Sequence, residues 1–184
     1  MQSAIGTTVE KQDGKIIKTI HIDLFGMDRI RTLISDYVDQ LKYANIPIPK
    51  IYGSHVKENK LIYVCQDVGE NIDWNNYIRE MLNVLYKAKN NNVCIDPHPR
   101  NFMMDENKKI WYVDFTPPYS EDYFNARLDM AKSSEKKLLE NHFSLFKPDN
   151  LIQHFIADIY KTNSKIEEII TAEKRRERLG VKLL

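Results

Sequence analysis

Two stretches decide the fold of this chain: Cys94-Ile95-Asp96-Pro97-His98-Pro99-Arg100-Asn101-Phe102 and Ile110-Trp111-Tyr112-Val113-Asp114-Phe115. Asn101 follows Asp96 by five positions, and Asp114 follows Asn101 by thirteen. The residues between them predict two short strands, 101–104 and 109–113, joined by a polar turn. Because a hairpin of that length returns the chain to its start, we expect Asp114 to lie beside Asn101.

This spacing of Asp96, Asn101 and Asp114 resembles that of the protein-kinase-like superfamily. The segment Asp96-Pro97-His98-Pro99-x-Asn101 is similar to the catalytic loop of the UbiB-type atypical kinases. The pairing of Ile95-Asp96 with Val113-Asp114-Phe115 is similar to the aminoglycoside phosphotransferases and other small-molecule kinases. The resemblance is best over roughly residues 15–115. It implies an ATP- and Mg²⁺-dependent phosphotransferase that acts on a hydroxyl.

The resemblance implies a role for each of these residues. Asp96 would orient the acceptor hydroxyl and take its proton, since phosphoryl transfer depends on positioning and charge neutralisation. The side-chain oxygen of Asn101 and the carboxylate of Asp114 would bind Mg²⁺, a hard cation that prefers oxygen ligands. His98 is interpreted as shaping the loop or contacting the substrate phosphate.

The first third of the chain predicts a small antiparallel sheet with one helix. Residues 3–10 and 15–22 read as strands, joined across the strong hairpin signal Asp13-Gly14. Apolar residues recur at helical spacing over 27–44, which predicts a helix. Two more strands follow, at 50–56 and 60–66.

The resemblance also implies three contacts to ATP in this region. Lys18, inside the second strand, matches the lysine that binds the phosphates. Its acidic partner is expected on the helix that follows, where Asp36 flanks the apolar face and is the first candidate, with Asp39 as the second. Gln66 and Val68 fall at the expected hinge, where peptide groups would hydrogen-bond the adenine.

The rest of the chain predicts a mostly helical lobe. One helix leads into the loop with Asp96 and three helical stretches follow it, at 74–89, 122–146, 149–160 and 164–179. We therefore expect an α+β, two-lobed protein-kinase-like fold: a small antiparallel sheet plus one helix, followed by a mostly helical lobe. The whole chain would form one minimal domain, 1–184, with its small lobe at 1–68 and its helical lobe at 69–184.

The sequence departs from the family in four places. No G-x-G-x-x-G loop precedes Lys18, so a shorter segment such as 2–8 would have to cover the phosphates. Cys94-Ile95, and not an Arg that could receive an activation-loop phosphate, stands directly before Asp96. Phe115 is followed by Thr116-Pro117-Pro118 and not by Gly. The missing glycine loop, with the absence of a Glu inside the 27–44 helix, keeps open a pseudokinase or a nucleotide-binding or protein-interaction module without catalysis.

The acceptor is not specified by the sequence. A hydroxyl-bearing small molecule is the first choice, since the departures fit small-molecule and atypical kinases. A protein substrate, phosphorylated by a Ser/Thr kinase of minimal size, stays open because the region after the site is short for a lobe that binds bulky sugars.

Composition narrows the partners. The 27 basic and 26 acidic residues give a net charge of +1, so no nucleic-acid partner is expected. No long apolar run or signal peptide is present, which predicts no membrane partner and a cytoplasmic location, with delivery into another cell still open. Cys65 and Cys94 are expected to be buried free thiols in a reducing compartment.

Overall fold

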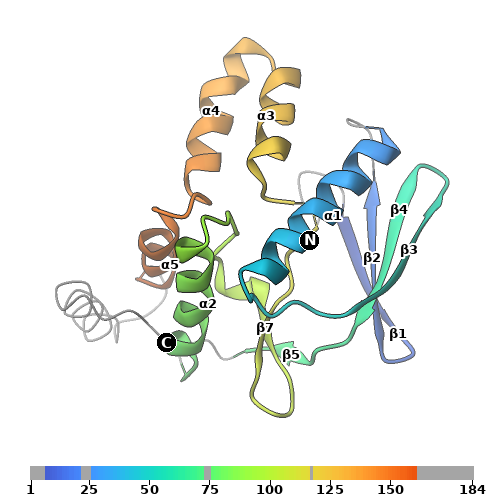
Figure 1. Cartoon of the computed structure of the whole chain (residues 1–184), viewed down its shortest axis with the longest axis vertical. Helices are drawn as coiled ribbons and strands as arrows, with labels where there is room; N and C mark the ends of the chain where they lie inside the picture. Colours follow the sequence, from blue (N-terminus) through green and yellow to red (C-terminus); the bar gives the residue numbers. More distant parts are fainter. Residues whose placement is uncertain (1–6, 22–25, 73–75, 117, 161–184) are drawn as a thin grey trace.

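The computed structural model describes residues 7–21, 26–72, 76–116 and 118–160. Its first part is a four-stranded antiparallel sheet of β1 (Thr7–Gln12), β2 (Lys15–His21), β3 (Ile51–Lys57) and β4 (Lys60–Gln66) (Figure 1). The strand order is β1-β2-β4-β3, so β2 and β4 are central. Asp13 and Gly14 both have positive φ, at 50° and 69°, as the predicted two-residue hairpin requires.

One helix, α1 (Met27–Tyr43), lies beside this sheet, which confirms the predicted helix to within one residue (Figure 1). It buries an apolar face: Ile30, Ile34, Tyr37, Val38 and Leu41. The next residues, Ala44 and Ile46, are buried as well, so the chain leaves the helix directly over the core.

A second, three-stranded sheet joins the two parts of the molecule. The predicted hairpin is confirmed as β6 (Phe102–Met104) and β7 (Ile110–Tyr112), and β5 (Glu70–Asn71) adds a strand that the sequence did not predict. Gly69 precedes β5 with φ 102°, and a Cβ there would overlap the carbonyl oxygen of Met104. Only glycine therefore lets the chain approach β6 this closely.

The second part is mostly helical, as predicted, and consists of α2 (Ile78–Asn90), α3 (Glu121–Met130), α4 (Ser133–Ser144) and α5 (Leu151–Tyr160). The helix expected over 74–89 begins at Ile78, and residues 73–75 lie outside the described ranges. The helix expected over 164–179 also lies outside them, as do residues 2–6 of the segment 2–8 proposed to cover the phosphates.

The single helix expected over 122–146 is wrong, because the chain breaks after Met130 and doubles back as α4 (Figure 1). Ala131 and Lys132 are extended, with ψ of 145° and 150°. This reversal stacks Phe124 on Phe143, with ring centroids 3.9 Å apart. A straight helix of that length would hold the two rings almost 30 Å apart, at about 1.5 Å per residue, so burial of the aromatic pair favours the break.

Buried side chains continue from the face of α1 through β4, α2 and β7 to α5 as one core. Cys65 and Cys94 are buried free thiols, as expected. Within the described ranges, no helix combines the length and apolar character needed to cross a membrane.

Candidate active site

The cavity between the four-stranded sheet and the helical part has a volume of about 470 Å³. Five residues predicted for the site line it together: Lys18, Gln66, Val68, Asn101 and Asp114. They come from β2, the end of β4, the hinge and the two ends of the β6–β7 hairpin. Residues more than ninety positions apart in the chain thus meet at one cavity.

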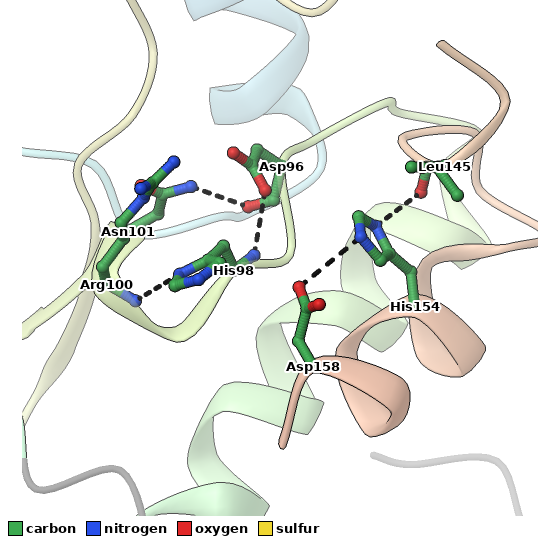
Figure 2. A network of polar contacts seen from close by, with 7 residues as sticks. All are labelled: Asp96, His98, Arg100, Asn101, Leu145, His154 and Asp158. Carbon is green, nitrogen blue, oxygen red and sulfur yellow. Dashed lines mark hydrogen bonds and ion pairs between the residues drawn. The ribbon is translucent and has the colours of Figure 1, made fainter. Parts of the chain in front are cut away.

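Asp96, the predicted base, is not among the residues that line this cavity; it lies in the adjoining loop, which is hydrogen-bonded to Asn101 (Figure 2). Its backbone N–H donates to Tyr112 Oη at 3.1 Å, and its Oδ1 accepts from the His98 N–H at 3.0 Å. Asn101 Nδ2 donates to the Asp96 carbonyl at 3.3 Å, and the Val113 N–H donates to the Asn101 carbonyl at 2.9 Å. These bonds bring Asp96, Asn101 and the strand before Asp114 together, as the spacing predicted.

His98 shapes this loop. Its Nδ1 accepts a hydrogen bond from the Arg100 N–H at 3.2 Å and caps the short 3₁₀ turn η2 (Pro99–Asn101). Burial and the positive charge of Arg100 lower the pKa of His98, while Asp96 and Asp158 oppose that shift. Because Nδ1 is used as an acceptor, the neutral imidazole carries its proton on Nε2.

Asp114 is partly buried, and its carboxylate accepts a hydrogen bond from Tyr119 Oη at 2.8 Å. Burial raises the pKa of Asp114 to about 6, against the opposing charge of Lys18 and with a further raising contribution from Asp96. Because burial disfavours the charged form of this carboxyl, a cation bound beside it would favour the carboxylate.

Lys18 is 7% exposed, and its amine lies over the ring of Phe115 at 4.4 Å from the centroid. Its Nζ donates to the Val113 carbonyl. Burial lowers the pKa of Lys18, and the charge of Asp114 opposes that shift. Burial therefore favours the neutral forms of both Lys18 and Asp114, while the charge of each partner favours the ionised form of the other.

The structure does not bring Asp36 to Lys18. Asp36 is exposed and lines a different cavity of about 900 Å³ together with Asp39, while Lys18 lines the cavity that holds Asp114. The physical reason is the rotation of α1, which turns its apolar face to the core and both acids outward. The expected pairing of Lys18 with a helix acid is thereby corrected, since the carboxylate that acts on Lys18 is Asp114.

Three tyrosines support the site, and none of them was predicted to do so. Tyr37 on α1 donates its hydroxyl to the Cys94 carbonyl at 2.8 Å, just before the loop of Asp96. Tyr112 receives the Asp96 N–H, and Tyr119 holds Asp114. The sequence marked Tyr37 only as a core residue, because a helical period reports burial and not what a hydroxyl meets.

The backbone of the hinge is only partly hydrogen-bonded among the described residues. The Gln66 N–H is used by the Lys50 carbonyl at 2.8 Å, whereas the Val68 peptide makes no hydrogen bond within the described ranges. Asp67 between them pairs with Lys11 of β1 at 2.6 Å and accepts the Gly69 N–H at 3.2 Å. These contacts anchor the hinge while leaving the Val68 peptide groups available to a ligand.

The oxygen atoms available at the cavity suit magnesium. Asn101 uses its Nδ2 toward Asp96, and its amide oxygen takes no hydrogen bond from the described residues. That oxygen and the Asp114 carboxylate are the hard ligands Mg²⁺ prefers, and this ion commonly binds through one or two protein groups plus phosphates and water. No group of three His, Cys, Asp or Glu residues suited to a metal occurs within the described ranges, so an all-protein cage is not built there.

No protein-family model and no curated protein matches the sequence. Among solved structures, the chain is similar to the bifunctional kinase-methyltransferase WbdD, with a TM-score of 0.42 and 11% sequence identity. The alignment covers 91% of this chain and 47% of that chain, so this chain spans about half the length of the protein it matches. What the cavity can do chemically must be argued from its own residues.

Proposed function

We propose that this protein is an ATP- and magnesium-dependent phosphotransferase that transfers the γ-phosphoryl group of ATP to a hydroxyl. One observation carries the proposal: Lys18, Asn101, Asp114 and the hinge line one cavity, and Asp96 adjoins it. The types of group needed for phosphoryl transfer thus lie at or next to one cavity. The volume of that cavity, about 470 Å³, suits a nucleotide.

The roles follow from the chemistry of each group. The Val68 peptide would hydrogen-bond adenine, and the Lys18 amine would bind phosphate oxygens in place of the Val113 carbonyl. Asn101 and Asp114 would hold Mg²⁺, which when bound neutralises phosphate charge. Asp96 would orient the acceptor hydroxyl and accept its proton as that oxygen bonds to the γ-phosphorus and ADP leaves.

The chain would act as one minimal unit, with residues 1–68 as the small lobe and 69–184 as the helical lobe. The acceptor is a small-molecule hydroxyl in this proposal, with a protein Ser or Thr as the alternative. A pseudokinase is the second candidate function. It is favoured by the contact of Lys18 with the Val113 carbonyl and by the outward position of both acids of α1.

Calorimetric titration with ATP, in the presence and absence of MgCl₂, tests nucleotide binding. Incubation with γ-labelled ATP and a panel of metabolites and proteins then tests transfer. Metal-dependent binding with label transfer supports the phosphotransferase, whereas binding without transfer to any acceptor or to water supports the pseudokinase. Absence of binding at millimolar ATP and magnesium would remove both.

A further inference from the structure

Thr116 carries a buried hydroxyl that no described residue satisfies. The residue is 2% exposed, and its Oγ1 makes no hydrogen bond within the described ranges. It nevertheless lines the same cavity as Lys18, Asn101 and Asp114. A buried hydroxyl without a partner is costly, and most such groups in folded proteins are paired. A ligand in the cavity would supply the missing partner.

The place of Thr116 in the chain indicates which end of the ligand it meets. It follows Asp114 by two residues, so the Cα atoms of the two residues lie within about 7 Å of one another. The hinge, where adenine is proposed to bind, lies on the segment after β4. A nucleotide that places its metal-bound phosphates at Asp114 therefore brings a phosphate group, and not its base, to Thr116.

Three other donors at this end are already used in the unliganded protein, and the cationic Arg100 lines the cavity as well. Tyr119 Oη donates to Asp114, and Asn101 Nδ2 donates to the Asp96 carbonyl. The Lys18 amine donates to the Val113 carbonyl. Phosphate oxygens are strong acceptors, and residues 1–17 contain no G-x-G-x-x-G motif whose peptide N–H groups would surround them. A hydroxyl donor at Thr116 meets part of that need.

We propose that Thr116 is a phosphate-binding residue whose hydroxyl donates a hydrogen bond to a phosphate oxygen of the bound nucleotide. This inference rests on the proposed function, because it takes ATP as the occupant of the cavity. It adds a binding residue that lies outside the Asp96, Asn101 and Asp114 pattern.

Two substitutions separate the hydroxyl from the shape of the side chain. Thr116→Val keeps the shape and removes the hydroxyl, and Thr116→Ser keeps the hydroxyl. By calorimetry, Thr116→Val should weaken Mg·ATP binding about tenfold or more, the effect of losing a hydrogen bond to a charged group. It should leave adenosine binding unchanged, and Thr116→Ser should stay within a few-fold of the wild type for both ligands.

Stability of the unliganded protein gives a second readout. Because an unpaired hydroxyl is removed from the interior, Thr116→Val should melt at the wild-type temperature or a few degrees above it. Thr32→Val is the matched control. It makes the same chemical change at an exposed position of α1, where Thr32 Oγ1 donates to the Asp28 carbonyl at 3.0 Å. This variant should not alter Mg·ATP binding.

The outcomes separate this inference from the proposed function. If wild-type protein binds Mg·ATP and Thr116→Val binds it equally well, the inference is overturned while the proposed function stands. An equal loss for adenosine and Mg·ATP, or a clearly lower melting temperature for Thr116→Val, assigns the hydroxyl a structural role and also overturns it. If the wild-type protein binds no Mg·ATP, both fail together.

Discussion

Tyr119 donates its hydroxyl to Asp114 Oδ2 at 2.8 Å, and its ring lies among aromatic residues of other elements. Its centroid is 4.9 Å from that of Phe146, which follows α4, and 6.4 Å from that of Tyr37 on α1. The carboxylate proposed to bind the metal is therefore oriented by a residue packed against both parts of the molecule. Such supporting hydrogen bonds commonly affect metal affinity.

Tyr119→Phe should weaken magnesium binding by about 10- to 100-fold, because the hydrogen bond that orients Asp114 is lost while the ring packing is kept. The bond from Tyr119 also lowers the pKa of Asp114, so its loss favours the protonated carboxyl that cannot bind the metal. Mn²⁺ binding in the presence of ATP, followed by electron paramagnetic resonance, measures the effect.

Tyr43→Phe is the control for this variant, since Tyr43 is 82% exposed at the end of α1. In an Asp114→Asn background, adding Tyr119→Phe should have little further effect on metal affinity. Full additivity of the two substitutions would show that Tyr119 does not act through Asp114.

Asp114→Asn should stabilise the metal-free protein at pH 7.5 while reducing metal-dependent ATP binding. Burial raises the folded-state pKa of Asp114 from 3.8 to about 6, so between these values the folded state binds more protons than the unfolded state. Stability from this group is therefore present at low pH and is lost as pH rises through about 6. The gain in Asp114→Asn should be about 1–3 kcal/mol, allowing for partial exposure of the carboxyl.

Urea unfolding without divalent cations, at pH 4 and pH 7.5, checks this relation. The stability difference between Asp114→Asn and the wild type should shrink toward zero at pH 4. If Asp114→Asn is less stable than the wild type at pH 7.5, burial does not destabilise the Asp114 carboxylate as its raised pKa implies.

Lys18→Met should lower Mg·ATP affinity by about 10- to 100-fold, because a buried amine that can bond phosphate is lost. Asp36→Asn should leave affinity at the wild-type value, since Asp36 is exposed at a different cavity. Calorimetry on the two single variants is sufficient. Loss of affinity in Asp36→Asn would restore the pairing that the structure separates.

Asp96→Asn should lower the rate of phosphoryl transfer by about 10²- to 10⁴-fold, because a positioned base is lost. The affinity for Mg·ATP should change little. The amide oxygen of Asn can still accept the His98 N–H, so the loop should keep its shape. Steady-state transfer from labelled ATP, with binding measured in parallel, provides the test. Full turnover in this variant would exclude Asp96 as the base.

Gly69→Ala should destabilise the protein by about 2–4 kcal/mol, because φ is 102° and the added methyl group would overlap the Met104 carbonyl. Gly53→Ala is the matched control. No atom lies within 4 Å of a Cβ built there, so its effect should stay within about 0.5 kcal/mol. Chemical unfolding of both variants decides the matter, and equal stabilities would show that the hinge can shift away from β6.

The sequence alone determined the features that depend on short separations along the chain. A hairpin of fixed length must return Asp114 to Asn101, and the Asp13-Gly14 turn joins β1 to β2 because both residues take positive φ. The helical period over 27–44 located α1 because its apolar face must be buried. The α+β order of a small sheet, one helix and a mostly helical part followed from these local patterns.

Only the tertiary structure decided which groups from distant segments meet. The rotation of α1 against the core turned Asp36 outward. Asp114 is therefore the carboxylate whose charge acts on the Lys18 amine. Stacking of Phe124 on Phe143 broke the expected long helix, and packing placed the Tyr119 hydroxyl on Asp114. Side-chain partners depend on how whole elements rotate and pack to bury their apolar faces, and a residue's spacing along the chain carries no record of that rotation.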